Sequence, residues 1–351
     1  MDIRIFFTKK RPLDDEDYPT GNNPSCFAEA KSLPTLSKAQ DVNIQVTDLD
    51  LPKIDRNASN VAFIGVGQMG ARMVKNLISK GEKVKVFDSV PQAASSVQGV
   101  TICNSPEEAA KDAAFVFTML PNGHIVKDTL LGEKGIMKGI KKNALFIDSS
   151  TIEPQQSQEL GKIAKENGFR FLDAPVSGGV TGAEAGTLTF MVGGEDGDAE
   201  EVKPILLKMG KNVFKCGGTG TGQIAKLCNN LILAITMIGT CESLNMGVKL
   251  GMDPKLLTNI INVSTGRSWS SDTYNPVPGV MPNVPSSNHY KGGFGVPLIA
   301  KDLALAESAA LSVGAPLPLG AISHQLYRTL IANGFSDKDF AVVYEFLKGQ
   351  K

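Results

Sequence analysis

Lys226, Asn229 and Asn230 place an ammonium group and two amides within an otherwise apolar run that extends from Gly222 to Leu233. At helical spacing the three positions lie on one face, because residues three and four apart on a helix are neighbours. Buried polar side chains need hydrogen-bond partners, and a bound substrate can be one of them. This pattern favours a lysine acid/base, which is a group able to move the proton of a hydroxyl.

A glycine-rich turn earlier in the chain gives that lysine its chemical context. The GxGxxG pattern directly follows an apolar strand and begins a helix. In such a motif Gly65 makes the tight turn, Gly67 lets the backbone approach a pyrophosphate, and Gly70 permits close packing of helix and strand. The helix N-terminus then faces the phosphates. The candidate cofactor-binding residues of this motif are Gly65, Gly67, Gln68, Met69 and Gly70.

The ends of the following strands offer further cofactor contacts. Asp88 ends the strand expected at 83–87, where a carboxylate can accept hydrogen bonds from both ribose hydroxyls and repels a 2′-phosphate. NAD is therefore expected in preference to NADP. Two later strands end in the turns 118–121 and 148–151, and ligands of open α/β sheets bind at the carboxyl ends of strands. The candidate contacts in these turns are Leu120, Pro121 and Thr151.

A Ser-Gly-Gly turn, Ser177-Gly178-Gly179, follows another strand at 170–174. Such a turn can direct a hydroxyl and backbone N–H groups at a carboxylate. Taken alone it reads equally well as an ordinary loop, and it gains a substrate-binding interpretation only together with the lysine.

The elements that must position these groups alternate between strand and helix. Strands are expected at 61–66, 83–87, 113–119, 144–148 and 170–174, and helices at 68–80 and 154–167. This alternation predicts a Rossmann-like, doubly wound parallel sheet in a domain spanning 58–218. A mainly α-helical substrate and dimerisation domain is expected at 219–351. Its helices are expected at 220–250, 254–262, 297–313, 316–331 and 337–348.

Composition excludes several other classes of function. Lysine plus arginine equals aspartate plus glutamate at 36 each, so no overall charge favours nucleic acid or a membrane surface. The longest apolar run, 231–238, is far shorter than the roughly 20 residues of a membrane span. The three histidines have no metal-ligand spacing, so no metal site is expected. The five cysteines include no Cys-x-x-Cys pair and indicate reduced thiols.

These motifs together resemble the β-hydroxyacid dehydrogenase family. The resemblance covers 61–347 and rests on several segments, of which 264–276 is typical of the branch that acts on 3-hydroxyisobutyrate. The other segments are 63–77 with its Lys-Asn-Leu, 173–179, 186–189, Gly222-Gln223 with Lys226, Asn229 and Asn230, and Lys301-Asp302-Leu303.

The resemblance implies NAD in the first domain and oxidation of 3-hydroxyisobutyrate to methylmalonate semialdehyde in valine catabolism. It implies Lys226 as acid/base, the Ser-Gly-Gly turn on the substrate carboxylate and Asn230 near the substrate. It also implies Lys301 near the nicotinamide end of the cofactor. Ile125 departs from the family, which often has an asparagine four residues after the Leu-Pro dipeptide. Two alternatives stay open, a related semialdehyde reductase and a non-catalytic interaction module.

The leader, 1–57, lacks sustained periodicity and is expected to be largely disordered. It carries eight basic and ten acidic side chains, whereas a mitochondrial presequence is rich in arginine and poor in acids. The resemblance implies the mitochondrial matrix, and this leader leaves the cytosol or nucleus open. Its segment 3–11 resembles a sliding-clamp-binding box without the leading glutamine. Clamp binding is therefore one interpretation of this segment, and a disordered tail is the other. The expected partners are a small hydroxyacid and, through the helical domain, a second copy of the chain.

Overall fold

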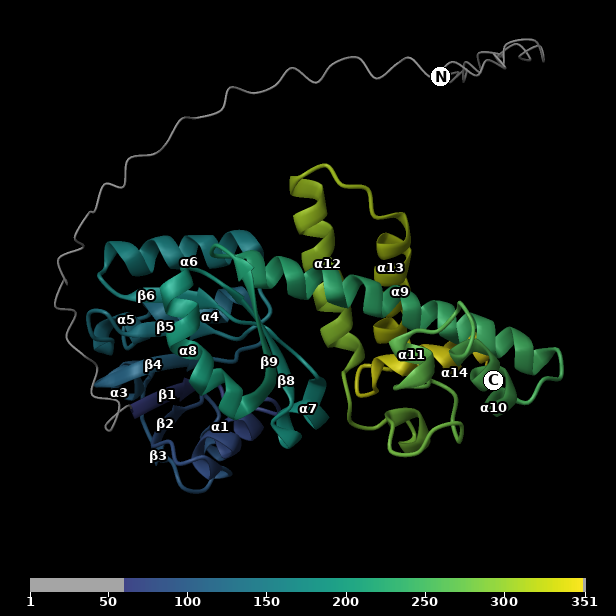
Figure 1. Ribbon diagram of the computed structural model, residues 1–351, viewed down its shortest axis with the longest axis horizontal. Coiled ribbons are helices and arrows are strands. Elements are labelled where there is room, and N and C mark those ends of the chain that lie inside the picture. The colour runs from purple at the N-terminus through teal and green to yellow at the C-terminus, as the bar shows by residue number, and fades with distance from the viewer. Residues whose placement is uncertain (1–59, 350–351) are drawn as a thin grey trace, which may run out of the picture. The chain divides into compact units, whose positions relative to one another are not determined.

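The computed structural model describes residues 60–349. The predictions for the leader 1–57 and for its segment 3–11 lie outside these residues. The described chain forms an α/β unit followed by a group of helices (Figure 1). The strands are β1 (Asn60–Ile64), β2 (Val84–Phe87), β3 (Thr101–Ile102), β4 (Ala113–Thr118), β5 (Leu145–Asp148), β6 (Arg170–Asp173), β7 (Val176–Ser177), β8 (Leu188–Gly193) and β9 (Gly210–Gly217).

Helices connect the strands, and after β9 the described chain forms helices. Those of the α/β unit are α1 (Gly70–Ser79), α2 (Pro91–Ser95), α3 (Pro106–Ala110), α4 (Gly123–Leu131), α5 (Ile136–Gly139), α6 (Pro154–Glu166), α7 (Gly179–Ala185) and α8 (Asp196–Met209). The later ones are α9 (Thr221–Lys249), α10 (Pro254–Asn262), α11 (Trp269–Asp272), η2 (Pro285–Asn288), α12 (Val296–Ser312), α13 (Pro318–Ala332), η3 (Phe340–Val342) and α14 (Val343–Lys348).

The sheet follows the doubly wound order that the alternating pattern predicts. Its path is β3-β2-β1-β4-β5-β6-β8-β7, and β9 pairs with β8. The five expected strands pair in parallel, with Ile64 beside both Phe87 and Thr118. Strands are added to one side of β1 as far as β3 and to its other side from β4 onward, so the carboxyl ends of β1 and β4 lie at the switch point where such sheets bind ligands. The prediction of a Rossmann-like sheet followed by a helical region is confirmed.

One edge of the sheet departs from the expected parallel arrangement. β8 runs antiparallel to β6 and to β7, and β9 runs parallel to β8, so β8 and β9 are both antiparallel to the five expected strands. The connection from β7 to β8 is the short helix α7, which turns back through Gly186. A single short helix returns the chain beside the strand it has just left, and mixed edges of this kind are common on doubly wound sheets.

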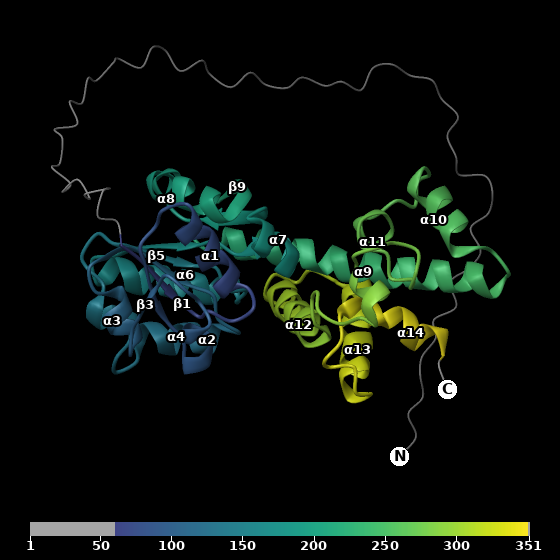
Figure 2. The ribbon, with the colours of Figure 1, turned by 90° about the horizontal axis from the view of Figure 1, so that it is seen from below.

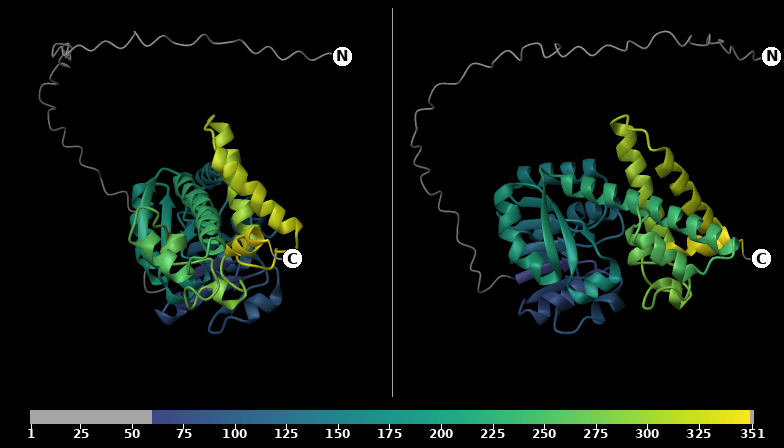
Figure 3. Two further views of the ribbon diagram at one scale, coloured as in Figure 1. Left: turned by 90° about the vertical axis from the view of Figure 1, so that its right-hand side faces the viewer. Right: turned by 45° about the vertical axis from the view of Figure 1, so that its right-hand side comes forward.

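Both faces of the sheet are buried, as parallel strands require. Along β1, Val61 and Phe63 face a core shared with α1, α7 and α8, while Ala62 and Ile64 face a core shared with α3 to α6. All four side chains are at most 1% exposed. A third core joins α9 to α12, α13 and α14. Figures 2 and 3 show α9 passing from the side of the sheet into this helical group.

The α9 helix has the length and mean hydropathy of a membrane span, which the short apolar run 231–238 did not predict. Its buried side chains, including Ala234, Met237 and Leu244, pack in the core of the helical group. Lys226 and Asn230 are buried on the same helix. This packing is that of a central helix in a folded domain, a setting in which long apolar helices also occur.

Candidate active site

The glycine-rich turn has room for a ligand at its middle glycine. Gly65 has a φ of +93°, and a side chain there would overlap the carbonyl oxygen of Met119. A Cβ at Gly70 would overlap the carbonyl oxygen of Gly65. A Cβ at Gly67 would meet no protein atom within 4 Å. Packing therefore explains the first and third glycines, and the open backbone at Gly67 fits the close approach of a pyrophosphate.

The N-terminus of α1 fits the same group. Met69 precedes the helix and makes no side-chain cap, so the first amides have no side-chain acceptor at that position. Gln68 is exposed, and Arg72 holds it by donating to its backbone oxygen at 2.7 Å and to its Oε1 at 3.0 Å. The N–H groups of Ala71 and Arg72 donate to the backbone oxygens of Gly67 at 3.0 Å and Met69 at 3.1 Å. The positive end of the helix dipole at this uncapped N-terminus favours an anion.

Asp88 lies against the glycine-rich turn. Its Oδ2 accepts from the backbone N–H of Val66 at 2.8 Å, and its Oδ1 accepts from that of Val90 at 2.8 Å. These bonds fix the carboxylate at the end of β2 and still leave lone pairs on each oxygen. Asp88 is half-buried, so part of the carboxylate is accessible from solvent.

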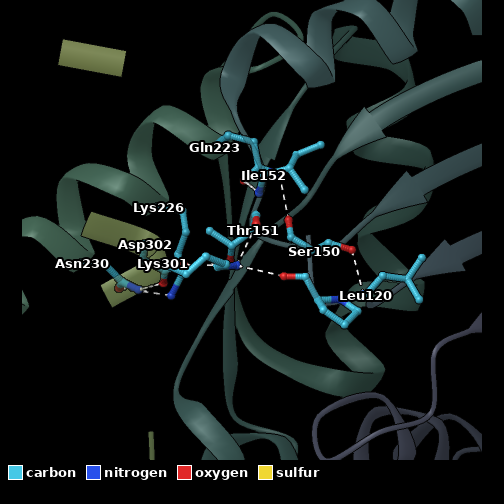
Figure 4. Close-up of polar contacts among 10 residues, drawn as sticks. Leu120, Ser150, Thr151, Ile152, Gln223, Lys226, Asn230, Lys301 and Asp302 are labelled. Atoms are coloured by element: carbon cyan, nitrogen blue, oxygen red, sulfur yellow. Dashed lines mark hydrogen bonds and ion pairs between the residues drawn. The ribbon is translucent and has the colours of Figure 1, made fainter. Parts of the chain in front are cut away.

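Lys301 of α12 connects the turns that follow β4 and β5. Its Nζ donates to the carbonyl oxygen of Thr151 at 2.9 Å and to that of Pro121 at 3.3 Å (Figure 4). The same two turns are joined by the Leu120 N–H, which donates to Ser150 Oγ at 2.9 Å. The structure thus brings together three predicted cofactor contacts and the lysine from the second domain.

Lys226 lies in the first half of α9 and is 8% exposed. Its Nζ donates to Asn230 Oδ1 at 3.1 Å, one helical turn away, and Asn229 Nδ2 donates to the same oxygen at 3.1 Å. Burial lowers the pKa of Lys226, the Asp302 carboxylate opposes that shift, and the charge of Lys301 adds to it. A lowered pKa increases the fraction of neutral amine, the form that accepts a proton.

Asp302 completes the polar cluster, and the analysis of residue spacing did not assign it a role. Its Oδ2 accepts from Asn230 Nδ2 at 2.5 Å, its Oδ1 lies 3.3 Å from Lys301 Nζ, and the residue is 3% exposed. The carboxylate therefore fixes the amide of Asn230 with its oxygen toward Lys226. The signals in the sequence were its place in the Lys301-Asp302-Leu303 segment of the family resemblance and an acid next to a lysine, a pair that is also typical of a solvated helix surface.

Asp173 attaches α9 to the sheet and was also missed as a site residue. This buried carboxylate at the end of β6 accepts from the N–H groups of Gly220 at 2.6 Å and Gln223 at 3.0 Å. Burial raises its pKa to about 6, while these two bonds oppose that shift. Gln223 Nε2 also donates to the Ser150 carbonyl at 2.8 Å. The start of the helix that carries Lys226 is thus fixed to β6 and to the turn after β5.

The Ser-Gly-Gly turn lies apart from this network. Ser177 is half-buried, Gly178 and Gly179 are exposed, and both glycines have positive φ, +131° and +61°. Among residues 60–349 the hydrogen bonds that link Lys226, Asn230, Lys301 and Asp302 do not include this turn. Both glycines of the turn are therefore accessible from solvent.

Two protein-family models match the chain, one over the α/β region and one over the helical region. Residues 60–218 match the model described as the NAD binding domain of 6-phosphogluconate dehydrogenase. Residues 220–347 match the model described as NAD-binding of NADP-dependent 3-hydroxyisobutyrate dehydrogenase. The human mitochondrial 3-hydroxyisobutyrate dehydrogenase is 50% identical over 293 residues, which are 83% of this chain and 87% of the human one.

The chain belongs to the 3-hydroxyisobutyrate dehydrogenase family. The mitochondrial enzyme of Drosophila melanogaster is 47% identical over 84% of this chain and 91% of its own length. A solved structure of 3-hydroxyisobutyrate dehydrogenase from Mycobacterium tuberculosis with L-serine matches with a TM-score of 0.78 and 40% identity, over 83% of this chain and 99% of that one. As a member of this family, the chain is an oxidoreductase with an NAD-binding Rossmann domain.

Proposed function

We propose that this dehydrogenase oxidises 3-hydroxyisobutyrate to methylmalonate semialdehyde with NAD, in valine catabolism, and that Lys226 is its acid/base. The observation that carries the proposal is the buried amine of Lys226, hydrogen-bonded to Asn230 in a chain half identical to dehydrogenases named for this substrate. Oxidation of a primary alcohol removes a hydride from carbon and a proton from the hydroxyl. NAD, when bound, accepts the hydride, and the protein must supply a base and an orientation.

Lys226 is suited to take the hydroxyl proton because its surroundings favour the neutral amine. Burial lowers its pKa, and Lys301 acts in the same direction. The bond to Asn230 Oδ1 fixes the direction of the amine at 3.1 Å and uses one of its positions, which leaves others for the substrate hydroxyl. In the reverse reaction the protonated amine returns the proton to the developing alkoxide.

The carboxylate of the substrate is assigned to Ser177, Gly178 and Gly179, and Asn230 is assigned a contact with the substrate. The hydroxyl of Ser177 and the amides of Gly178 and Gly179 are uncharged donors, and the backbone N–H groups of such a turn can bind an anion. The Asn230 amide is oriented by Asp302 before any substrate arrives, which reduces the ordering cost of binding.

The cofactor is assigned to the glycine-rich turn, in which Gly67 lets the pyrophosphate approach the backbone and Gly65 and Gly70 permit the close packing that shapes the turn. Gln68 and Met69 are assigned to the helix N-terminus beside the pyrophosphate. Asp88 is assigned to the ribose hydroxyls, which supports NAD over NADP because a carboxylate repels a 2′-phosphate. At the other end, Leu120, Pro121 and Thr151 line the turns that Lys301 joins, which supports an assignment of that lysine to the nicotinamide side.

The proposal also includes a homo-oligomer formed through the helical region. Several apolar side chains of α9, α10 and the turns beside them are at least 45% exposed, and exposed apolar surface favours a protein contact. They are Ile232, Met246, Leu250, Leu256, Ile260 and Val263. Light scattering of the purified chain tests this part, since a monomer at micromolar concentration contradicts it.

Localisation to the mitochondrial matrix is proposed from the human and fly relatives, both named mitochondrial. Imaging of the full chain with a C-terminal fluorescent protein, beside a version lacking residues 1–57, tests it. A cytosolic or nuclear signal from the full chain contradicts the assignment, and a nuclear signal that depends on residues 3–11 favours the sliding-clamp reading.

The activity is tested by following NADH formation by the purified full chain. 3-Hydroxyisobutyrate is compared with L-serine, tartronate semialdehyde and succinic semialdehyde, the semialdehydes being assayed in the reductive direction. The highest kcat/KM is expected with 3-hydroxyisobutyrate and NAD. A semialdehyde with a higher value identifies a related reductase, and no turnover of any member indicates a non-catalytic module.

A further inference from the structure

Asn76 of α1 contacts two carbonyl groups that lie far apart in the sequence. Its Nδ2 donates to the Arg72 oxygen on the same helix at 3.0 Å and to the Ala183 oxygen of α7 at 2.7 Å. The second bond joins residues 107 positions apart. The last carbonyls of a helix have no partner within that helix, so Ala183 near the end of α7 needs a donor from elsewhere. Asn76 supplies that donor.

The end of α7 fits the amide of Asn76 closely. Gly186 terminates the helix with a φ of +65°, in the left-handed region that favours glycine. A Cβ at Gly186 would lie 2.9 Å from Asn76 Oδ1 and 3.4 Å from its Cγ. Any larger residue would therefore move the amide away from α7. Both the donor and the glycine that admits it belong to motifs on which the family resemblance rests.

The other end of α7 carries the Ser-Gly-Gly turn. The helix begins at Gly179, and Gly182 N–H donates to the Gly178 oxygen at 3.0 Å, so the turn and the first helical residues form one unit. A seven-residue helix is only about 10 Å long. A shift where α7 meets Asn76 therefore moves the turn as well. α1 and α7 are neighbours in Figures 1 and 2, and Ala183 is fully buried in the core that α1 shares.

A second contact joins the same helices but contributes less. Arg72 Nε lies 2.7 Å from Glu184 Oε2, with side chains 27% and 61% exposed. Exposed ion pairs of this kind contribute little to stability, because solvent screens the two charges. The hydrogen bond from the half-buried amide of Asn76 is the contact that fixes the position of α7 on α1. Its loss leaves the Ala183 carbonyl without a side-chain donor.

We infer that Asn76 is a positioning residue that holds the substrate-carboxylate turn, Ser177-Gly178-Gly179, in place on the cofactor helix. This inference rests on the proposed function. α1 begins at the glycine-rich turn, so the helix whose N-terminus meets the cofactor also sets where the substrate carboxylate binds. Asn76 lies in the second half of α1, so its replacement is expected to affect binding of the carboxylate and to spare binding of the dinucleotide.

The test compares Asn76→Ala with Lys75→Ala, an exposed neighbour on the same helix. For Asn76→Ala the KM for 3-hydroxyisobutyrate is expected to rise roughly tenfold, the scale of one buried hydrogen bond. The kcat at saturation and the Kd for NADH, measured by fluorescence, are expected to change by less than about threefold. Lys75→Ala is expected to change none of these constants. Gly186→Ala, which displaces the same amide, is expected to reproduce the rise in KM.

Binding of a competitive inhibitor that shares only the substrate carboxylate distinguishes a displaced Ser177-Gly178-Gly179 turn from a general loss of order in the protein. Isobutyrate keeps the carboxylate of the substrate and lacks the hydroxyl, so its inhibition constant is expected to rise by the same factor as KM. An unchanged inhibition constant, or an NADH Kd that weakens as much as KM, overturns the inference. Failure of the wild-type chain to oxidise 3-hydroxyisobutyrate overturns both proposals, whereas an active wild type with an unaffected Asn76→Ala variant overturns this one alone.

Discussion

Replacement of Lys226 by methionine removes the proposed acid/base while preserving the shape of the side chain. Asn230 Oδ1 loses the bond from Lys226 but keeps the one from Asn229 Nδ2 at 3.1 Å, so no buried acceptor is left without a donor. A buried amine is also replaced by an apolar group, which removes a desolvation cost. The free energy of unfolding is therefore expected to stay the same or to rise.

The expected kinetic effect is large by comparison. A positioned general acid or base contributes about 10²- to 10⁴-fold, which corresponds to roughly 2.7–5.4 kcal/mol of the activation free energy. Lys226→Arg keeps a positive charge but stays protonated at neutral pH, so its turnover is expected to fall almost as far. The Kd for NAD is expected to remain nearly unchanged in both variants, because the contacts of Lys226 do not include the glycine-rich turn.

The assay combines single-turnover NADH formation, NADH binding by fluorescence and thermal unfolding. Lys249→Met on the exposed last turn of the same helix is the matched control, and wild-type constants are expected for it. If Lys226→Met keeps more than about a tenth of the turnover with normal NAD binding, proton transfer does not depend on Lys226. A variant that loses turnover and also unfolds early would contradict the argument from the retained Asn229 bond.

Three further outcomes are expected. The wild-type enzyme prefers NAD, and Asp88→Ala narrows the ratio of kcat/KM for NAD to that for NADP; equal efficiency with both cofactors in the wild type contradicts the role of Asp88. Asp302→Asn removes the charge that raises the pKa of Lys226, so the acid limb of the pH profile of kcat/KM moves to lower pH, and a move to higher pH refutes this reasoning. Deletion of residues 1–57 leaves kcat and KM within about twofold, and a tenfold loss with an unchanged circular dichroism spectrum shows that the leader takes part.

The sequence by itself determined the local features of this dehydrogenase. The five parallel strands, the long helices and the glycine-rich turn each depend on residues close together in the chain, whose spacing reports directly on secondary structure. The contact between Lys226 and Asn230 is also a local feature, because residues four apart on a helix are neighbours. Spacing also indicated the cofactor, since the GxGxxG pattern is itself a local motif.

Only the tertiary structure decided the contacts that join distant segments. Asp302 reaches Asn230 across 72 positions and Lys301 reaches Thr151 across 150, and neither separation follows from a helical or strand period. The attachment of α9 to Asp173 and the antiparallel edge at β8 likewise depend on which elements pack together. The sequence of an acid beside a lysine on a helix is the same whether the pair lies in solvent or in a buried cluster. Asp302 is part of the site because the folded chain buries it against α9.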